Sequence, residues 1–264
     1  MEGRTDSMKV TVCELPNDWT VRPKVQSALK DHLAQEGSEL LLLPEMGFDR
    51  WLAAQDRVDP ELWRAAVDRH LEWIDRLDEW GVAAVAGTRP ALVDGKALNV
   101  GWVWSRESGH VDVHEKYYLP DEEGFYEATW YAMGNGMFQL AELCGLRVGF
   151  LICTEIWFTD RAREYAREGI DLLLCPRATP ATSRSVWLAG GQAAAWVSGA
   201  YCLSSNYNGP VTSEMDFGGA AWITEPDGGT RLGVSSEARP FVTVDIDPAV
   251  SRAAKTGYPR YVRE

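Results

Sequence analysis

The chain has 264 residues, of which 45% are hydrophobic and 25% are charged, and its formal net charge is −13. This length and composition are typical of a globular protein with one large core. The negative charge disfavours nucleic acid as a partner, because an acidic surface repels the phosphate backbone.

The apolar patterning predicts neither a membrane span nor a secretory signal. No apolar run is long enough to cross a bilayer, so we expect no membrane contact. Residues 1–8 are polar and lack the apolar stretch of a signal peptide. We expect these residues to be disordered, with the structured chain beginning near Met8.

The cysteines indicate reduced thiols. There are five of them, an odd number, and no CxxC spacing occurs. This usage suits a cytoplasmic protein better than a disulfide framework or a zinc site. The sequence therefore predicts a cytoplasmic protein that needs no metal. The five residues are Cys13, Cys144, Cys153, Cys175 and Cys202.

The chain opens with alternating strand and helix patterns. Residues 9–15 (KVTVCEL) alternate and stop before Pro16, which predicts a strand. Residues 21–36 have helical spacing and end at Gly37. A short apolar strand follows at 39–43, directly before Pro44-Glu45.

A long helix is expected to begin at Asp59-Pro60. Asp59 suits the N-cap and Pro60 suits the first turn. His70 lies on the apolar face of this helix, so we expect a core or interface histidine, not a ligand.

Strand and helix patterns alternate through the rest of the chain, which predicts an α/β domain with helices covering the sheet faces. Residues 117–136 interrupt this alternation as a long loop rich in acidic and aromatic residues. A loop of this length is usually functional or disordered, and its aromatic residues argue against disorder. Further strands are predicted at 82–87, 98–104, 111–116, 146–152, 170–175, 201–205, 220–224 and 241–247, and further helices at 161–168 and 183–199.

We expect residues 9–250 to form a single domain, since no linker or repeat interrupts them. Residues 251–264 form a polar tail in which Tyr258 and Tyr261 suit a position at a subunit interface.

Three predicted strands end in chemically useful residues: Glu45, Lys116 and Cys153. A thiol that attacks an amide or nitrile carbon must lose its proton, and a carboxylate in a partly dry pocket can take it. A lysine ammonium, with the backbone N–H after the cysteine, can stabilise the resulting negative charge. The lysine also favours the thiolate. These residue types therefore form a coherent catalytic set.

The motifs around these residues resemble those of the nitrilase superfamily, the carbon–nitrogen hydrolases. The resemblance covers nearly the whole chain from Met8 to about Asp247, and the motifs occur in the family's order with family-like spacing. They are LLLPE at 41–45, VAGT at 85–88 followed by Leu98-Asn99, EKYYLP at 115–120, GFLICTE at 149–155, FGG at 217–219 and EPDG at 225–228.

The resemblance implies a four-layer α-β-β-α sandwich of the nitrilase type, a homodimer or higher homo-oligomer, and no cofactor. It makes Glu45 the general base, Lys116 the transition-state cation and Cys153 the nucleophile. It further implies a second glutamate before a Gly-aromatic pair, which Glu123 fits, with Glu122 and Glu127 as alternatives. This glutamate would orient the substrate amide and hold the lysine.

Three more residues are candidates for substrate binding. Thr154 stands where the family often has an aromatic residue, and we expect it to contribute its backbone N–H. Trp157 either lines a pocket for an apolar group or packs in the core. Arg177 either binds a substrate carboxylate or pairs with an acid such as Glu155.

The expected function is hydrolysis of a small-molecule carboxamide or N-carbamoyl compound through a Cys153 thioester, releasing ammonia or an amine. A nitrile is the alternative substrate for the same residues. A Cys–His hydrolase using His114 and Cys153 is conceivable, but it leaves Glu45 and Lys116 unexplained. A non-catalytic interaction protein is the alternative of another class, and the intact catalytic set argues against it.

Overall fold

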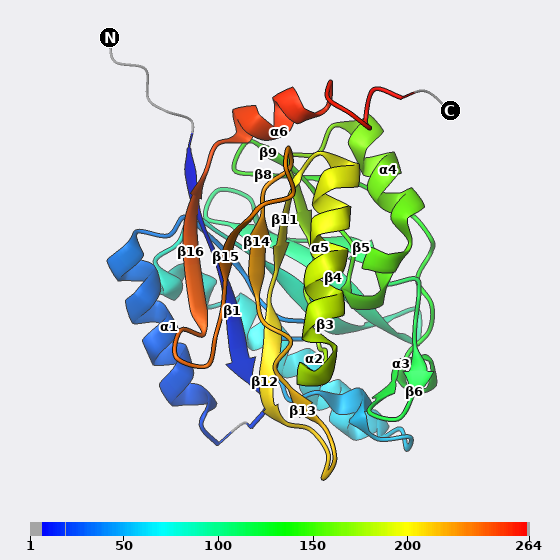
Figure 1. The fold of residues 1–264 in the computed structure, drawn as a ribbon. Helices are drawn as coiled ribbons and strands as arrows, with labels where there is room; N and C mark the ends of the chain where they lie inside the picture. Colours follow the sequence, from blue (N-terminus) through cyan, green and yellow to red (C-terminus); the bar gives the residue numbers. More distant parts are fainter. Residues whose placement is uncertain (1–6, 19, 263–264) are drawn as a thin grey trace.

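Two β-sheets face each other across the main apolar core (Figure 1). The structure is a computed structural model that describes residues 7–18 and 20–262. Most of the expected disordered start lies outside these residues, whereas Met8 already belongs to the first strand, β1.

The first sheet has eight strands and is largely parallel at its centre. Strand β1 pairs in parallel with β2 and β12, and β2 pairs in parallel with β3. Strand β16 pairs with β1 in the antiparallel sense. The order is β13 (Asp216–Phe217), β12 (Asn206–Pro210), β1 (Met8–Pro16), β2 (Leu40–Leu42), β3 (Ala84–Val93), β4 (Lys96–Ser105) and β5 (Gly109–Glu115), with β16 (Phe241–Ile246) on β1.

The second sheet has six strands, of which β9, β10 and β11 are parallel. These three are buried along their length, with the exception of the exposed Arg147 in β9. The order is β15 (Arg231–Val234), β14 (Trp222–Thr224), β11 (Tyr201–Ser204), β10 (Leu172–Leu174), β9 (Leu146–Phe150) and β8 (Ala141–Leu143).

Strand periodicity explains how the layers stack. In β2, Leu40 and Leu42 face the core between the sheets, whereas Leu41 faces the outer core beneath the helices. Helices α1 (Arg22–Glu36) and α2 (Pro60–Ile74) cover that outer face.

Helices α4 (Thr159–Glu168) and α5 (Arg184–Ser198) lie on the outer face of the second sheet, α5 across β11 and β14 in Figure 1. A Cβ at Gly191 of α5 would lie 2.4 Å from Nε1 of Trp222, so this glycine permits the helix to approach the sheet closely. The expected four-layer sandwich is therefore confirmed.

The predictions for helix α2, an N-cap at Asp59 and a core histidine at His70, agree with the structure. Asp59 caps α2 by accepting hydrogen bonds from the backbone N–H groups of Glu61 and Leu62. His70 is buried, with Nδ1 2.7 Å from the Ala66 carbonyl oxygen, and is a core residue of this chain.

The long loop at 117–136 contains short elements that the sequence analysis did not predict. They are β6 (Asp121–Glu122), β7 (Phe125–Tyr126) and α3 (Glu127–Trp130). The described residues also form four short 3₁₀ helices: η1 (Leu52–Ala54), η2 (Leu77–Trp80), η3 (Cys153–Trp157) and η4 (Ala181–Ser183).

The described part of the tail packs on its own chain. Helix α6 (Pro248–Ala254) buries Ser251 and Ala254, and the Arg260 guanidinium lies 5.5 Å from the centre of the Trp196 ring. Tyr258 and Tyr261 are exposed.

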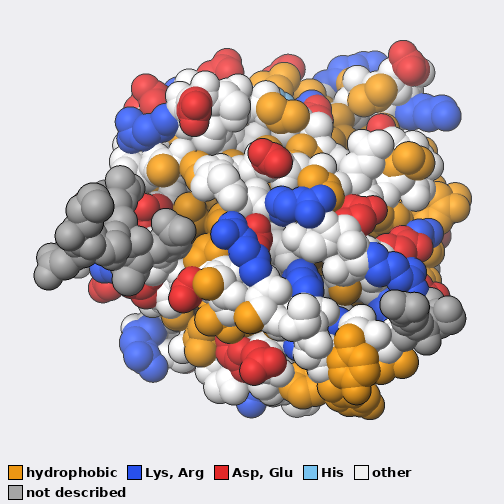
Figure 2. Space-filling model, turned by 90° about the horizontal axis from the view of Figure 1, so that it is seen from above, with side chains coloured by type: hydrophobic (Ala, Val, Ile, Leu, Met, Phe, Trp, Pro, Cys, Tyr) orange, Lys and Arg blue, Asp and Glu red, His pale blue; other side chains and the backbone are white. Residues whose placement is uncertain are grey.

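The described surface around α6 is of mixed charge. Figure 2 shows Lys and Arg side chains interspersed with Asp and Glu on this face. No described helix is both long enough and apolar enough to cross a membrane.

Candidate active site

The ends of strands from both sheets meet at one buried group of side chains. Glu45 follows β2, and Lys116 follows β5. Because β4 is antiparallel to both β3 and β5, strand β5 runs in the same direction as β3, and therefore as β2. Cys153 follows β9 of the second sheet. All three side chains are buried.

The ammonium of Lys116 binds two carboxylates. Its Nζ lies 2.7 Å from Oε1 of Glu45 and 2.5 Å from Oε2 of Glu127, and all three side chains are inaccessible to solvent. The Tyr131 hydroxyl donates a short hydrogen bond to the same oxygen of Glu127.

The structure places Glu127, and not Glu123, beside the lysine. Glu123 is exposed in the turn between β6 and β7, whereas Glu127, the first residue of α3, contacts Lys116. Glu122 is also exposed. The Gly-aromatic pair after Glu123 forms the hairpin turn, and the chain reaches the lysine only after it has passed through β7.

Asn99 and Tyr131 belong to the same group of side chains, and the sequence analysis assigned neither of them to the site. Asn99 lies on β4, and its Nδ2 donates a hydrogen bond of 2.7 Å to Oε1 of Glu45. The sequence signal for Asn99 was its place in a family motif; Tyr131 gave no signal beyond lying in the aromatic loop.

Cys153 begins the 3₁₀ turn η3 with φ at +50°. Residues other than glycine rarely adopt this left-handed conformation, which is found disproportionately at functional sites. The thiol lies 3.8 Å from the carbonyl oxygen of Ala178, in the loop after β10. Cys153 is therefore the first residue of the turn that follows β9, and not a residue of the strand itself.

Burial decides the protonation of the thiol. It raises the pKa of Cys153 to about 12, and the nearby charge of Glu45 adds to this rise. Lys116 opposes the rise but does not overcome it. The expectation that the lysine would favour the thiolate is therefore met in direction only, and the resting residue is a neutral thiol.

The charged groups around the thiol perturb one another. Burial raises the pKa of Glu45, although Lys116 and Asn99 lower it. Burial raises the pKa of Glu127 to about 8. Burial lowers the pKa of Lys116, but Glu127 and Glu45 more than compensate, so the lysine stays protonated.

Three acceptor atoms in this group are buried without a hydrogen-bond partner among the described residues: Oε2 of Glu45, Oε1 of Glu127 and Oδ1 of Asn99. A buried acceptor without a donor costs about 1–3 kcal/mol. N–H donors brought by a ligand would remove this cost.

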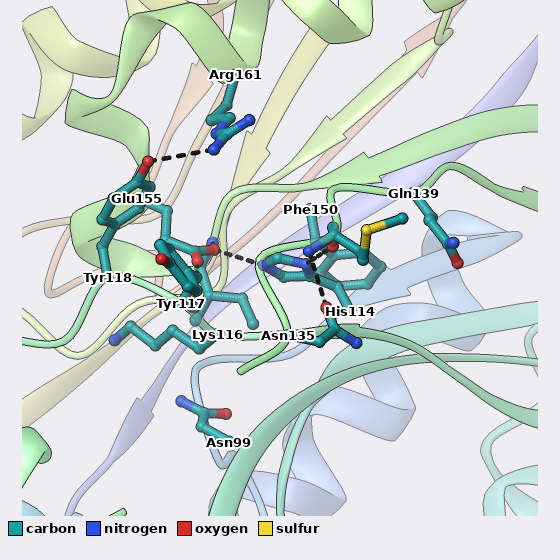
Figure 3. A network of polar contacts seen from close by, with 12 residues as sticks. Asn99, His114, Lys116, Tyr117, Tyr118, Asn135, Gln139, Phe150, Glu155 and Arg161 are labelled. Atoms are coloured by element: carbon teal, nitrogen blue, oxygen red, sulfur yellow. Dashed lines mark hydrogen bonds and ion pairs between the residues drawn. The ribbon is translucent and has the colours of Figure 1, made fainter. Parts of the chain in front are cut away.

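A second network of polar contacts is centred on Glu155 (Figure 3). The ring nitrogens of His114 lie 2.8 Å from Oε2 of Glu155 and 3.3 Å from the carbonyl oxygen of Met137. Because both ring nitrogens are engaged in this way, the structure gives no support to the Cys–His alternative.

The guanidinium of Arg177 bonds neither to Glu155 nor to any other acidic group among the described residues. It is fully buried, donates to Ser204 and Thr179 and to the backbone carbonyl of Ala220, and lies 3.9 Å from the centre of the Trp222 ring. All three guanidinium nitrogens thus bond to neutral groups of the protein.

The two remaining candidates lie in the turn after the cysteine. Thr154 is half-buried. The Trp157 ring is 42% exposed and packs 5.0 Å from the Trp187 ring of α5, so it is not a core residue of this chain.

Comparison with known proteins identifies similar sequences and folds. The family model described as carbon–nitrogen hydrolase matches residues 9–256. A glutamine-dependent NAD(+) synthetase of Rhodobacter capsulatus is 24% identical over 261 residues, which are 92% of this chain and 44% of that protein. An N-carbamoylputrescine amidase of Solanum tuberosum is 26% identical over 156 residues, covering 53% of this chain and 52% of that one. The chain spans about half the length of the curated relatives it matches.

Two solved structures share the fold at low sequence identity. A carbon–nitrogen hydrolase from Helicobacter pylori G27 has a TM-score of 0.85 at 16% identity, over 98% of this chain and 95% of that one. An amidase of the nitrilase superfamily from Nesterenkonia AN1 has a TM-score of 0.77 at 20% identity, over 95% of both chains.

Proposed function

The chain belongs to the carbon–nitrogen hydrolase family, and we propose that it hydrolyses a carboxamide or an N-carbamoyl compound through a thioester on Cys153. The observation that carries this proposal is the buried contact of Lys116 with both Glu45 and Glu127, next to the cysteine turn.

Glu45 is the proposed general base. It takes the proton from the Cys153 thiol while the sulfur attacks the carbonyl carbon, so a neutral resting thiol suits this step. The oxyanion that forms is stabilised by the Lys116 ammonium and by the backbone N–H of Thr154. Glu45 then gives the proton to the leaving nitrogen, and ammonia or an amine departs.

A water molecule then hydrolyses the thioester, with Glu45 again acting as the general base. Glu45 takes a proton from a water molecule, the water oxygen attacks the thioester carbon, and the thiolate leaves and regains the proton. Glu127 holds Lys116 in place throughout and accepts an N–H of the substrate. In this scheme Arg177 supports the loop after β10 from within the protein.

The unpaired acceptors favour an amide over a nitrile. Oε2 of Glu45, Oε1 of Glu127 and Oδ1 of Asn99 need N–H donors. A carboxamide or carbamoyl nitrogen supplies two, whereas a nitrile supplies none. A ligand that leaves buried polar groups of the site without hydrogen bonds binds much more weakly than one that pairs them. The similarity to N-carbamoylputrescine amidases places N-carbamoyl amines among the first compounds to assay.

We further propose that the enzyme works in the cytoplasm as a homo-oligomer. The five cysteines are all free, as reduced thiols would be. Light scattering on the purified protein measures the oligomeric state, and a monomer at assay concentration would contradict this part.

The decisive experiment measures ammonia release from a set of amides, N-carbamoyl compounds and nitriles, together with intact mass after brief exposure to each. Cys153→Ala is expected to abolish turnover and the covalent adduct. Cys202→Ala is the control, because Cys202 is also buried and has a pKa raised to about 12. Full activity in the Cys153 variant would refute the mechanism.

A further inference from the structure

We propose that Glu155 is a positioning residue, which fixes the Lys116 ammonium relative to the Cys153 thiol. The inference rests on the proposed function, since it assigns Glu155 a part in the same reaction. Glu155 does not act on the substrate itself in this proposal.

The carboxylate of Glu155 accepts hydrogen bonds from the chain neighbours of Lys116 and Cys153. Its Oε1 accepts a hydrogen bond of 2.7 Å from the backbone N–H of Tyr117, the residue after Lys116. Its Oε2 accepts a hydrogen bond of 2.8 Å from the backbone N–H of Ile152, the residue before Cys153. One side chain therefore joins the end of β5 in the first sheet to the end of β9 in the second.

The His114 side chain is a second link between Glu155 and strand β5, which leads to Lys116. It lies on β5, two residues before Lys116, and its Nε2 is 2.8 Å from Oε2 of Glu155. The side chains of His114 and Glu155 are both inaccessible to solvent. Figure 3 shows the His114 ring directed at the Glu155 carboxylate, with the Lys116 side chain extending away from both.

The bond to Ile152 also bears on the backbone of the nucleophile. Cys153 has φ at +50°, a left-handed conformation that is strained for a residue with a Cβ. The hydrogen bond from Ile152 to Glu155 closes the turn in which this conformation occurs. Loss of that bond would let the turn relax and move the thiol. A displacement of about 1 Å between reacting groups can lower a rate by about 10²-fold.

Glu155→Gln is the first test, because it keeps the size of the side chain. Three donors approach the two carboxylate oxygens, and glutamine has only one oxygen, so at least one donor loses its acceptor in either orientation of the amide. We expect kcat to fall about 10²-fold while KM changes less than about threefold.

Asp171→Asn is the matched control. Asp171 is also a buried carboxylate that accepts a backbone N–H, from Arg147 at 3.0 Å, and pairs with a cation, Arg252 at 3.2 Å. It precedes β10, at the opposite end of the parallel strands from Cys153. We expect this variant to lower the melting temperature but to keep kcat within twofold of wild type.

A second measurement does not depend on turnover. The rate of Cys153 alkylation by iodoacetamide, followed by the mass of the Cys153 peptide, reports the thiolate that Lys116 stabilises. Displacing the ammonium should slow alkylation about tenfold in Glu155→Gln but not in Asp171→Asn.

The outcomes separate the two proposals. Equal kcat and equal alkylation rates in Glu155→Gln and wild type, at a temperature where both are folded, overturn the positioning role. If that variant does not fold, His114→Gln replaces it, with an expected loss in kcat of about tenfold, and an unchanged kcat overturns the role. If the wild type turns over no compound, the proposed function fails, and the alkylation rates alone decide the role of Glu155.

Discussion

The ammonium of Lys116 lies 2.7 Å from Oε1 of Glu45, and both side chains are sealed from solvent. The lysine leaves Oε2 of the same carboxylate unpaired among the described residues. One oxygen of Glu45 is thus engaged with the cation, and the other is available to a proton. In the proposed mechanism, Glu45 can therefore accept the thiol proton while Lys116 stabilises negative charge.

Removal of Glu45, the proposed general base, should slow thioester formation severely. In Glu45→Gln the amide oxygen can still accept a hydrogen bond from Lys116, but the side chain no longer takes a proton from Cys153. We expect kcat/KM to fall about 10³-fold, within the usual range for general-base catalysis. Single-turnover kinetics of ammonia release measure the effect. Glu142→Gln, at an exposed position of β8, is the control, and an unchanged rate in Glu45→Gln would remove Glu45 as the base.

Two neighbouring glutamates should differ in their effect on activity. Glu127→Gln removes the carboxyl group that contacts Lys116, and we expect kcat to fall about 10²-fold. Glu123→Gln changes an exposed turn and should leave kcat/KM within twofold. Steady-state kinetics of the pair decide the assignment, since the reverse order of effects would restore Glu123 as the second glutamate.

Alkylation of Cys153 should depend steeply on pH. Because burial raises the pKa of Cys153 to about 12, the thiolate fraction below this pH grows about tenfold for each pH unit. We expect slow reaction with iodoacetamide at pH 7 and a continuous rise up to pH 10, measured peptide by peptide so that the exposed Cys144 is counted separately. A fast reaction that is independent of pH above 6 would instead indicate a resting thiolate–ammonium pair.

His70 should make the protein less stable in acid. Burial lowers the pKa of His70 to about 4, from an ordinary value of 6.5, and the charges of Arg22 and Arg69 also lower it. The neutral ring accepts a hydrogen bond of 3.2 Å at Nε2 from the backbone N–H of Phe48. Between these pH values the unfolded chain binds more protons than the folded one, so the free energy of unfolding falls as the pH falls, by at most about 3 kcal/mol.

Comparison of the wild type with His70→Leu isolates the contribution of His70 to the loss of stability in acid. His70→Leu is expected to be less stable at every pH, since Phe48 loses its acceptor, but its stability should decline less between pH 6.5 and 4. Urea unfolding of both proteins across this range measures the difference. Parallel declines in the two proteins would show that another group titrates.

The strongest local patterns in the sequence predicted the elements that hold the site. Alternation before Pro16 marked β1, the N-cap Asp59 marked the start of α2, and apolar runs marked the strands that end at Glu45 and Cys153. The division into two facing sheets came from the family resemblance, because strand periodicity does not show which sheet a strand joins. Strands of two to four residues, such as β8 and β13, are too short to show a period.

The missed parts of the site depend on contacts between distant segments. Glu127 could not be distinguished from Glu123 by its neighbours in sequence, because the hairpin of β6 and β7 determines which of them reaches Lys116. Glu155 seemed a partner for Arg177, but the fold places it beside His114, 41 positions away in the chain. These pairings follow from how the two sheets pack, which no local pattern specifies.

Glu45 and Lys116 follow strands of one sheet and Cys153 follows a strand of the other, so neither sheet alone carries the proposed catalytic set. A refolding chain that has formed its helices and strands, but has not yet packed the sheets together, would show a near-native far-UV circular dichroism spectrum and no activity. Recovery of activity therefore reports the docking of the two sheets. Before the sheets pack together, Cys153 is exposed to solvent and open to oxidation. Packing of the sheets buries its thiol and brings it next to Glu45 and Lys116 in the same step.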